Sequence, residues 1–368
     1  MSAAAYPLVD FGLVCALGRD RGEIAANLRR GVAPGMRELG GLYGGDRTFY
    51  GFLPGWGAAR PADFAADETR IGRLVELAAA QIAPSVRAAV QRFGARRVGV
   101  VIGSSGSTME EFIDHPDHID MAYASERLAA AFGIAGPQLT VSTACSSSAK
   151  TFAAARRLLE GGAADAVIVG GADAYTRTVV EGFHALEALS PGRCRPCSPR
   201  RDGINLGEGA ALFLMLAPEA KAAADGGVAL LGVGESSDAY HLTAPDPSGA
   251  GAEASMRAAL ADAGVDAAAI SFVNLHGTGT VYNDAMELAA VRRVFGRAVC
   301  ASSTKPLTGH CLGAAGAVEA ALCAIALEGG GDGGGCARPR RLALSNSFAF
   351  GGSNASVVLG EGVAVTHS

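Results

Sequence analysis

A strand, a helix and a second strand follow one another between residues 138 and 171, and this order constrains the fold more than any other feature of the sequence. Residues 138–142 are largely apolar or β-branched, residues 146–159 place apolar side chains at helical spacing, and residues 165–171 contain an unbroken apolar run. Two strands joined through a helix lie parallel in one sheet, and helices cover such a sheet. The sequence therefore predicts an α/β fold.

The second part of the chain repeats this alternation of strands and helices. A run of small residues at 222–227 is the best candidate boundary, so we expect two halves, residues 1–226 and residues 227–368. Residues 30–66 and 190–209 show no clear period and are interpreted as irregular connections. The expected strands are 9–17, 98–102, 138–142, 165–171, 210–216, one that opens at 228, 272–275, 299–302, 342–347 and 355–359, and the expected helices are 23–28, 69–93, 124–132, 146–159, 252–263, 284–295 and 313–327.

Composition argues against several classes of protein. The chain has 368 residues, of which 49% are hydrophobic and 18% charged, as is typical of a globular protein. The net charge is −5 and the 31 Lys and Arg residues are scattered, so nothing indicates a nucleic-acid-binding surface. No apolar run approaches the length of a membrane span, and the first residues lack the pattern of a signal peptide. We therefore expect a cytoplasmic protein without a membrane or nucleic-acid partner.

The eight cysteines lie at irregular spacings, which fits reduced thiols better than a disulfide framework. Cys194 and Cys197 form the only close pair, and one pair without a second is weak evidence for a zinc or redox site. His115 and His118 could also suggest a metal site, but a polar surface loop is the better interpretation. We expect no metal site.

One cysteine occupies a turn between a strand and a helix. Cys145 lies among small polar residues and directly precedes the helix expected at 146–159. The unpaired N–H groups and the dipole of a helix N-terminus stabilise a thiolate, which is the attacking form of cysteine. Cys145 is therefore a candidate nucleophile. The alternative is a small buried structural cysteine, and this stretch alone does not separate the two.

Two histidines follow expected strands in glycine-rich surroundings. His276 begins the run His-Gly-Thr-Gly-Thr that ends at Thr280, and His310 ends the run that begins at Lys305. Both lie at strand ends, where open α/β sheets place their sites, and Thr278 and Thr280 could hydrogen-bond an amide-bearing ligand. A core histidine satisfied by one carbonyl is the alternative for either site alone. Two such motifs beside a candidate nucleophile favour a catalytic set.

These motifs resemble those of the β-ketoacyl-acyl-carrier-protein synthases of the elongating type. Thr-Ala-Cys145-Ser-Ser matches the nucleophile motif of that family, residues 276–280 match its first histidine motif, and residues 305–310 match its second. The glycine-rich turn at 348–354 matches the closing motif, and residues 201–209 match the central loop. The resemblance covers essentially the whole chain. It implies a thiolase-like fold in which two similar α/β halves stack as five layers, αβαβα.

The resemblance also implies a role for each site residue. Cys145 would take an acyl chain from a carrier protein, and the N–H groups of Cys145 and Phe350 would form an oxyanion hole. His276 and His310 would stabilise the enolate that forms when malonyl-carrier protein loses carbon dioxide. The remaining implied roles are a polar network of Lys305 and Glu287 that holds His310, contacts of Thr278 and Thr280 with the pantetheine arm, and a place for Ile204 beside the acyl chain.

No cofactor is implied, because the substrates of this family arrive on the phosphopantetheine of acyl carrier protein. The implied assembly is a dimer, either with itself or with a chain-length homologue. Ile204 stands where elongating members usually carry phenylalanine, so the acyl length does not follow from the resemblance. The pair Asn283-Asp284 followed by Glu287 suggests the ketosynthases of aryl-polyene or other type II polyketide pathways.

Three alternatives remain open at this point. A thiolase would need a second catalytic cysteine near the C-terminus, and none follows Cys336, while a starter-type condensing enzyme uses Cys-His-Asn rather than two histidines with Lys305. A non-catalytic chain-length partner of the same fold would lack the nucleophile. A cysteine hydrolase would rest only on the presence of a cysteine and a histidine.

Overall fold

The computed structural model describes residues 4–56, 69–110, 119–220, 227–296, 299–330 and 341–361. The strands are β1 (Tyr6–Cys15), β2 (Met36–Leu39), β3 (Thr48–Gly51), β4 (Val98–Gly103), β5 (Gln138–Val141), β6 (Ala166–Asp173), β7 (Leu206–Gly207), β8 (Gly209–Leu216), β9 (Val228–Ser237), β10 (Phe272–Asn274), β11 (Cys300–Ser302), β12 (Leu342–Phe348) and β13 (Ser353–Glu361). The α-helices are α1 (Arg21–Arg30), α2 (Arg70–Phe93), α3 (Tyr123–Phe132), α4 (Ser147–Glu160), α5 (Arg177–Ala185), α6 (Ala250–Ala263), α7 (Val281–Phe295), α8 (Lys305–Thr308) and α9 (Ala315–Ile325). The loop with His115 and His118, and the expected boundary at 222–227 apart from Gly227, lie outside the described residues.

The main sheet consists of two five-stranded parts with the same strand order. The first part runs β5-β4-β6-β8-β1 and the second runs β11-β10-β12-β13-β9. In each part the first three strands are parallel, and the last two are antiparallel to their neighbours. The parts meet where Tyr6 to Leu8 of β1 pair with Val228 to Leu230 of β9. The predicted repeat of two similar α/β halves is therefore confirmed.

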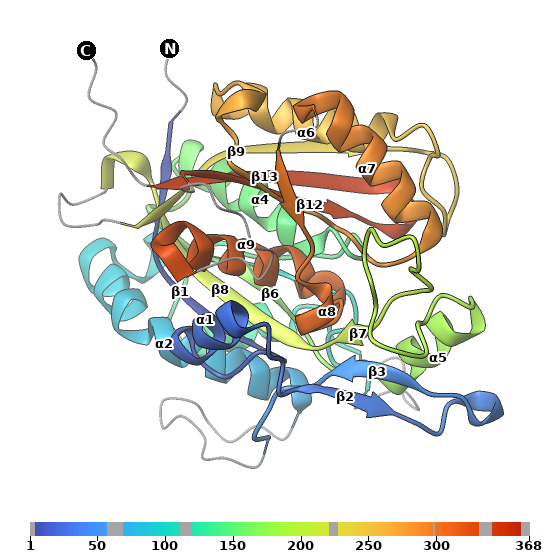
Figure 1. Ribbon diagram of the computed structural model, residues 1–368. Coiled ribbons are helices and arrows are strands. Elements are labelled where there is room, and N and C mark those ends of the chain that lie inside the picture. Colours follow the sequence, from blue (N-terminus) through green and yellow to red (C-terminus); the bar gives the residue numbers. More distant parts are fainter. Residues whose placement is uncertain are drawn as a thin grey trace.

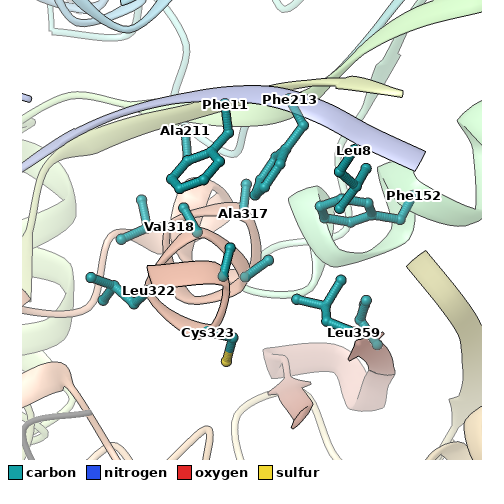
Figure 2. Packing of buried hydrophobic residues seen from close by; sticks show 14 of the residues in the cluster. Leu8, Phe11, Phe152, Ala211, Phe213, Ala317, Val318, Leu322, Cys323 and Leu359 are labelled. Atoms are coloured by element: carbon teal, nitrogen blue, oxygen red, sulfur yellow. The ribbon is translucent and has the colours of Figure 1, made fainter. Parts of the chain in front are cut away.

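Helices cover both faces of each part, so the protein has five layers (Figure 1). One apolar cluster joins α2 and α3 to the outer face of the first part, and another joins α6 and α7 to the outer face of the second. A third and larger cluster holds α4 and α9 between the two parts. Figure 2 shows this central cluster, in which Val318 of α9 lies near Phe11 of β1, and to which Leu322 of α9 and Phe213 of β8 also belong. The expected order αβαβα is confirmed.

The two central helices cross at close range. A Cβ at Gly316 of α9 would lie 2.6 Å from the backbone nitrogen of Ala149 in α4. Only glycine fits this crossing, because real Cβ atoms essentially never approach so closely. Since α4 follows the candidate nucleophile and α9 follows His310, this contact sets two parts of the site against each other.

Two connections that were expected to be irregular contain short strands. Residues 30–66 include β2 and β3, residues 190–209 include β7, and the three form a separate sheet in the order β2-β3-β7. Strands of four residues or fewer are too short to show a period in the sequence. Tyr50 of β3 pairs with Leu206 of β7, and both pack in one apolar cluster with Ile204.

The segment Leu312–Gly329 has the length and mean hydropathy (1.5) of a membrane span, so the expectation that no run approaches a span is wrong by these criteria. However, 89% of this segment is buried inside the protein. Core helices of soluble proteins share the same composition, and one such helix is weak evidence for a membrane protein. The position of α9 between the two halves of the sheet accounts for its apolar character.

The expectation of reduced cysteines needs one correction. Cys300 takes part in a disulfide, whose partner lies outside the described residues. Among the described residues, Cys15, Cys145, Cys194, Cys197 and Cys311 are free thiols.

Candidate active site

Cys145 lies in the turn that leads from β5 into α4. The helix begins at Ser147, Ser146 occupies the N-cap position, and Ala144 has a positive φ of 52°. This left-handed conformation is uncommon for alanine and marks a constrained turn. The Cys145 residue is 7% exposed. The strand-to-helix turn predicted from the sequence is therefore present, with the cysteine two residues before the first helical residue.

A pocket of about 320 Å³ opens at this turn. Seven of the predicted site residues line it, namely Cys145, Ile204, His276, Thr278, Thr280, His310 and Phe350. The fold thus gathers residues from both halves around one cavity. Lys305 and Glu287 do not line the pocket, because both are fully buried behind its wall.

The two histidines face each other across one corner of the pocket. Their ring centroids are 5.1 Å apart, and the ring planes meet at 85°. Within the described part of the chain, Nδ1 of His276 and both ring nitrogens of His310 are buried without a hydrogen-bond partner. Burial, followed by the positive charge of Lys305, holds the pKa of both imidazoles well below the usual value of 6.5. Neutral rings with free nitrogens can donate hydrogen bonds to a substrate oxygen.

Lys305 is fully buried and contacts a different carboxylate from the one expected. Its Nζ donates to Oε1 of Glu319 at 2.5 Å and also to the carbonyl oxygen of His276. Glu319 lies in α9 and was not among the residues selected from the sequence. The predicted network of Lys305 with Glu287 is therefore wrong, because Glu319 supplies the counter-charge and the lysine contacts the backbone of His276.

Glu287 holds the other side of the His276 turn. Its Oε1 accepts the N–H of His276 at 2.8 Å, and its Oε2 accepts the N–H of Gly277 at 2.7 Å. Asn346 also donates to Oε1, at 3.1 Å. Burial raises the pKa of Glu287 to about 7, although these hydrogen bonds act in the opposite direction. Glu287 thus fixes the backbone that carries His276 rather than His310.

The thiol of Cys145 is protonated at neutral pH. Burial raises its pKa to about 11, against the lowering effects of the Lys305 charge and of hydrogen bonds from the N–H groups of Phe350 and of Cys145 itself. The sequence-based expectation of a stabilised thiolate considered the helix end alone and neglected desolvation, which is the larger effect here. The two N–H groups that point at the sulfur are the pair expected to form the oxyanion hole.

Phe350 belongs to a tight turn between β12 and β13. Its ring stacks on Phe183 of α5, with centroids 5.5 Å apart, and both rings line the pocket. Thr278 and Thr280 lie on the opposite strand-end loop, with their Oγ1 atoms 2.9 Å apart. Ile204 is 2% exposed and joins the pocket to the apolar cluster of the small sheet.

A family profile described as "Beta-ketoacyl synthase, N-terminal domain" matches residues 72–221, and one described as "Beta-ketoacyl synthase, C-terminal domain" matches residues 228–331. The chain belongs to the β-ketoacyl synthase family. It is an acyltransferase of the condensing type, which confirms the resemblance stated from the sequence motifs.

Relatives of this β-ketoacyl synthase align over between about two thirds and nearly all of its length. Nodulation protein E of Rhizobium sp. (strain N33) is 33% identical over 95% of this chain and 97% of its own. The 3-oxoacyl-[acyl-carrier-protein] synthase 2 of Staphylococcus aureus is 35% identical over 64% of this chain and 65% of its own. Among solved structures, the ketosynthase ApeO in complex with its chain length factor ApeC from Xenorhabdus doucetiae matches with 39% identity, a TM-score of 0.88 and 98% coverage of both chains. The ishigamide ketosynthase/chain length factor matches with 26% identity, a TM-score of 0.83, and coverage of 98% of this chain and 99% of that chain.

Sequence reasoning missed Glu319, although a signal for it existed. In α9, the otherwise apolar helix Ala315–Ile325, it is the single charged residue, and charged side chains are rarely buried unless they are paired. A buried lysine or arginine elsewhere was therefore to be expected. No sequence pattern connected this carboxylate to Lys305 in particular.

Cys194 and Cys197 support the loop that packs on the pocket. The N–H of Cys194 donates to Oδ1 of Asn205, and the N–H of Cys197 donates to Oδ2 of Asp284, both at 2.6 Å. Over the described ranges of the chain, no group of three or more His, Cys, Asp or Glu side chains could hold a metal ion.

Proposed function

We propose that this protein is a β-ketoacyl-acyl-carrier-protein synthase that joins an acyl group on Cys145 to a malonyl unit with loss of carbon dioxide. One observation carries the proposal. In the described part of the chain, His276 and His310 line the same pocket as the buried Cys145 and have three ring nitrogens without a hydrogen-bond partner. An unpaired buried polar atom is costly, and each neutral imidazole has one N–H, so a substrate oxygen that binds there can accept one hydrogen bond from each ring.

In the first half-reaction, the Cys145 thiol gives up its proton to solvent, and the resulting thiolate attacks the carbonyl carbon of an acyl thioester on the carrier protein. The carbonyl oxygen becomes an oxyanion, and the N–H groups of Cys145 and Phe350 stabilise it. The pantetheine sulfur then leaves as a thiolate and takes up a proton. The acyl group remains as a thioester on Cys145.

In the second half-reaction, malonyl-carrier protein enters with its thioester oxygen between the two imidazoles. The carbon–carbon bond to the carboxylate breaks, carbon dioxide leaves, and the electron pair forms an enolate. Neutral His276 and His310 stabilise the enolate oxygen by donating hydrogen bonds. The enolate carbon attacks the acyl-Cys145 carbonyl, and the Cys145 thiolate leaves from a product that is two carbons longer.

Other residues of the site support the catalytic cysteine and histidines. Lys305 holds the His276 carbonyl and adds positive charge near the pocket, and Glu287 holds the His276 N–H. Thr278 and Thr280 contact the pantetheine arm, and Ile204 lies beside the acyl chain. The reaction uses no cofactor beyond the carrier-bound substrates.

The proposed setting is a type II fatty acid or polyketide pathway in the cytoplasm. Among the specialised pathways we favour aryl-polyene synthesis, supported by the 39% identity to the ApeO–ApeC ketosynthase structure. The partners would be acyl carrier protein and a second subunit, either another copy or a chain length factor such as the one named for that structure. Residues 1–226 would form the half with the nucleophile, and residues 227–368 the half with the histidines.

The test is a reconstituted condensation. An acyl-carrier protein and malonyl-carrier protein are mixed with the wild-type chain, and the carrier-bound products are analysed by mass spectrometry. The proposal predicts a β-ketoacyl product two carbons longer, and its absence with Cys145→Ala. If the wild-type chain is inactive alone but a co-purified partner activates it, the heterodimeric form is supported. A lack of product with every carrier and partner would overturn the proposal and favour a non-catalytic chain-length role.

A further inference from the structure

We propose that Ser146 is a positioning residue, whose hydroxyl contact with Ser353 sets the distance between the two N–H donors of the oxyanion hole. This inference rests on the proposed function, because it concerns the same acyl-transfer step. It goes beyond that function because it gives a positioning role to two serines that do not line the pocket.

The two donors of the oxyanion hole come from separate halves of the protein. Cys145 follows β5 in the first half, and Phe350 follows β12 in the second half. Both N–H groups lower the pKa of the Cys145 thiol, although burial raises it overall. Because the two N–H donors belong to different halves, a contact between the halves must fix the distance between them. Each donor must lie within about 3 Å of the developing oxyanion.

Ser146 and Ser353 supply such a contact. Ser146 directly follows Cys145 and is fully buried, and its single hydroxyl hydrogen is within donating distance of two acceptors, Oγ of Ser353 at 3.0 Å and the Thr143 carbonyl oxygen at 2.9 Å. Ser353 follows the Phe350 turn, and its carbonyl accepts the N–H of Ala349 at 2.9 Å, which closes that turn. The hydrogen bond therefore joins the nucleophile turn directly to the turn that carries the second donor.

The Ser146 hydroxyl does not cap α4, although Ser146 occupies the N-cap position. Serine at an N-cap normally accepts an N–H from the first helical turn, but Ser146 makes no such side-chain bond. Instead, its Oγ lies 2.9 Å from the Thr143 carbonyl oxygen and 3.0 Å from Thr143 Oγ1. These contacts hold the hydroxyl within the nucleophile turn, so that it faces Ser353.

The backbone hydrogen bonds of the Phe350 turn reach its own half, whereas the Phe350 ring stacks on Phe183 of the first half. The N–H of Gly351 donates to the Leu242 carbonyl at 2.7 Å, and the N–H of Asp238 donates to the Gly352 carbonyl at 2.9 Å. Both partners lie between β9 and α6. Loss of the Ser146–Ser353 contact would leave the turn folded but remove a polar link between it and the Cys145 turn. Small misplacements of catalytic groups reduce catalytic rates strongly while leaving the fold intact.

The test compares two reactions of Cys145 that need the hole to different degrees. Acylation by a thioester creates an oxyanion, whereas alkylation by iodoacetamide forms the carbon–sulfur bond and expels iodide without one. Alkylation rates across pH give the thiolate fraction, and the acylation rate is divided by this fraction. For Ser146→Ala we expect the corrected acylation rate to fall about tenfold or more. We expect the maximal alkylation rate to change less than about threefold.

The matched control removes a similar contact elsewhere. Oγ of Ser255 lies 3.1 Å from Oγ of Ser356 and donates to the Ala252 carbonyl at 3.0 Å, so Ser255→Ala deletes the same chemistry remote from the pocket. This control should leave both rates unchanged. Ser353→Ala, at a less buried position, should reproduce the Ser146→Ala effect, and Ser353→Thr, which keeps the hydroxyl, should restore the rate.

The outcomes separate this inference from the proposed function. Unchanged corrected acylation in Ser146→Ala and Ser353→Ala would overturn the positioning role, provided that the wild type is acylated. Equal losses in Ser255→Ala would do the same, because they would indicate a general effect of losing a buried hydroxyl. A wild-type chain that no thioester acylates would instead refute the proposed function.

Discussion

Replacement of Lys305 by methionine should destabilise the protein and also change the titration of its site. The lysine side chain is 0% exposed and that of Glu319 3% exposed, so neither charge has access to water. Removing the ammonium leaves the Glu319 carboxylate buried, and its second oxygen already lacks a partner in the described part of the chain. Loss of one member of a buried pair costs roughly 3–5 kcal/mol, and we expect Lys305→Met to lower the free energy of unfolding by about that amount.

The same substitution should shift the pKa of three pocket residues upward. Burial is the main cause of the raised pKa of Cys145 and of the lowered pKa of both histidines, and the Lys305 charge lowers all three. Without this charge the pKa of Cys145 should rise above about 11. Each unit of increase cuts the thiolate fraction about tenfold at a given pH below the pKa. Iodoacetamide alkylation of the folded variant, followed from pH 7 upward, measures this change.

A double variant separates charge from packing. Lys305→Met combined with Glu319→Leu removes both charges and keeps similar volumes, so it should recover most of the lost stability. Urea unfolding of the wild type, the single variants Lys305→Met and Glu319→Leu, and the double variant gives the coupling energy between the two side chains. If Lys305→Met is as stable as the wild type, or if the double variant is less stable than Lys305→Met, the account of a buried ion pair is refuted. An unchanged pH profile of alkylation would refute the electrostatic role of Lys305.

Three further predictions concern the other site residues. Burial raises the pKa of Glu287 to about 7, so the stability that this side chain contributes is lost as pH rises from about 4.5 to 7; in urea unfolding, the stability of the wild type relative to Glu287→Gln should fall over this range, and a constant difference would contradict the raised pKa. Both histidines remain neutral at pH 6, so condensation from pre-acylated enzyme in single-turnover assays should not slow between pH 8 and pH 6; a clear loss centred near 6.5 would contradict their lowered pKa. Ile204→Phe should narrow the pocket and slow acylation by long chains about tenfold relative to short ones, as measured by competition between the two donors; an unchanged ratio would place the acyl chain elsewhere.

Local patterns in the sequence were sufficient to predict many of the strands and helices. The apolar runs at 98–102 and 165–171 and the helical spacing at 146–159 predicted β4, β6 and α4 within a few residues. The turn that bears Cys145 followed from them. The small sheet was missed because β7 has two residues, and its pairing with β3 depends on contacts that are distant in the chain.

Pairing between buried charges could not be predicted in the same way. The sequence contains Lys305, Glu287 and Glu319, and the last two lie on different helices that both approach the pocket. Which carboxylate meets the ammonium depends on how α9 passes between the halves of the sheet, and not on local spacing. The raised pKa of Cys145 has the same origin, because desolvation is a property of the assembled core.

The contact between Ser146 and Ser353 shows this limit most clearly. Both serines stand in motifs that the sequence marked as functional, yet their 207-residue separation gave no indication that they touch. Only the stacking of the two halves brings them together.

The central claim is that Cys145 carries the acyl group, and intact mass spectrometry tests it most directly. The wild-type chain and Cys145→Ala are each mixed with acyl-carrier proteins of several chain lengths, and the protein mass is measured before malonyl donor is added. The account predicts an acyl adduct on the wild type alone, mapped to the Cys145 peptide, that disappears when malonyl-carrier protein is added. An adduct that persists in Cys145→Ala, or no adduct with any donor or partner subunit, would contradict it.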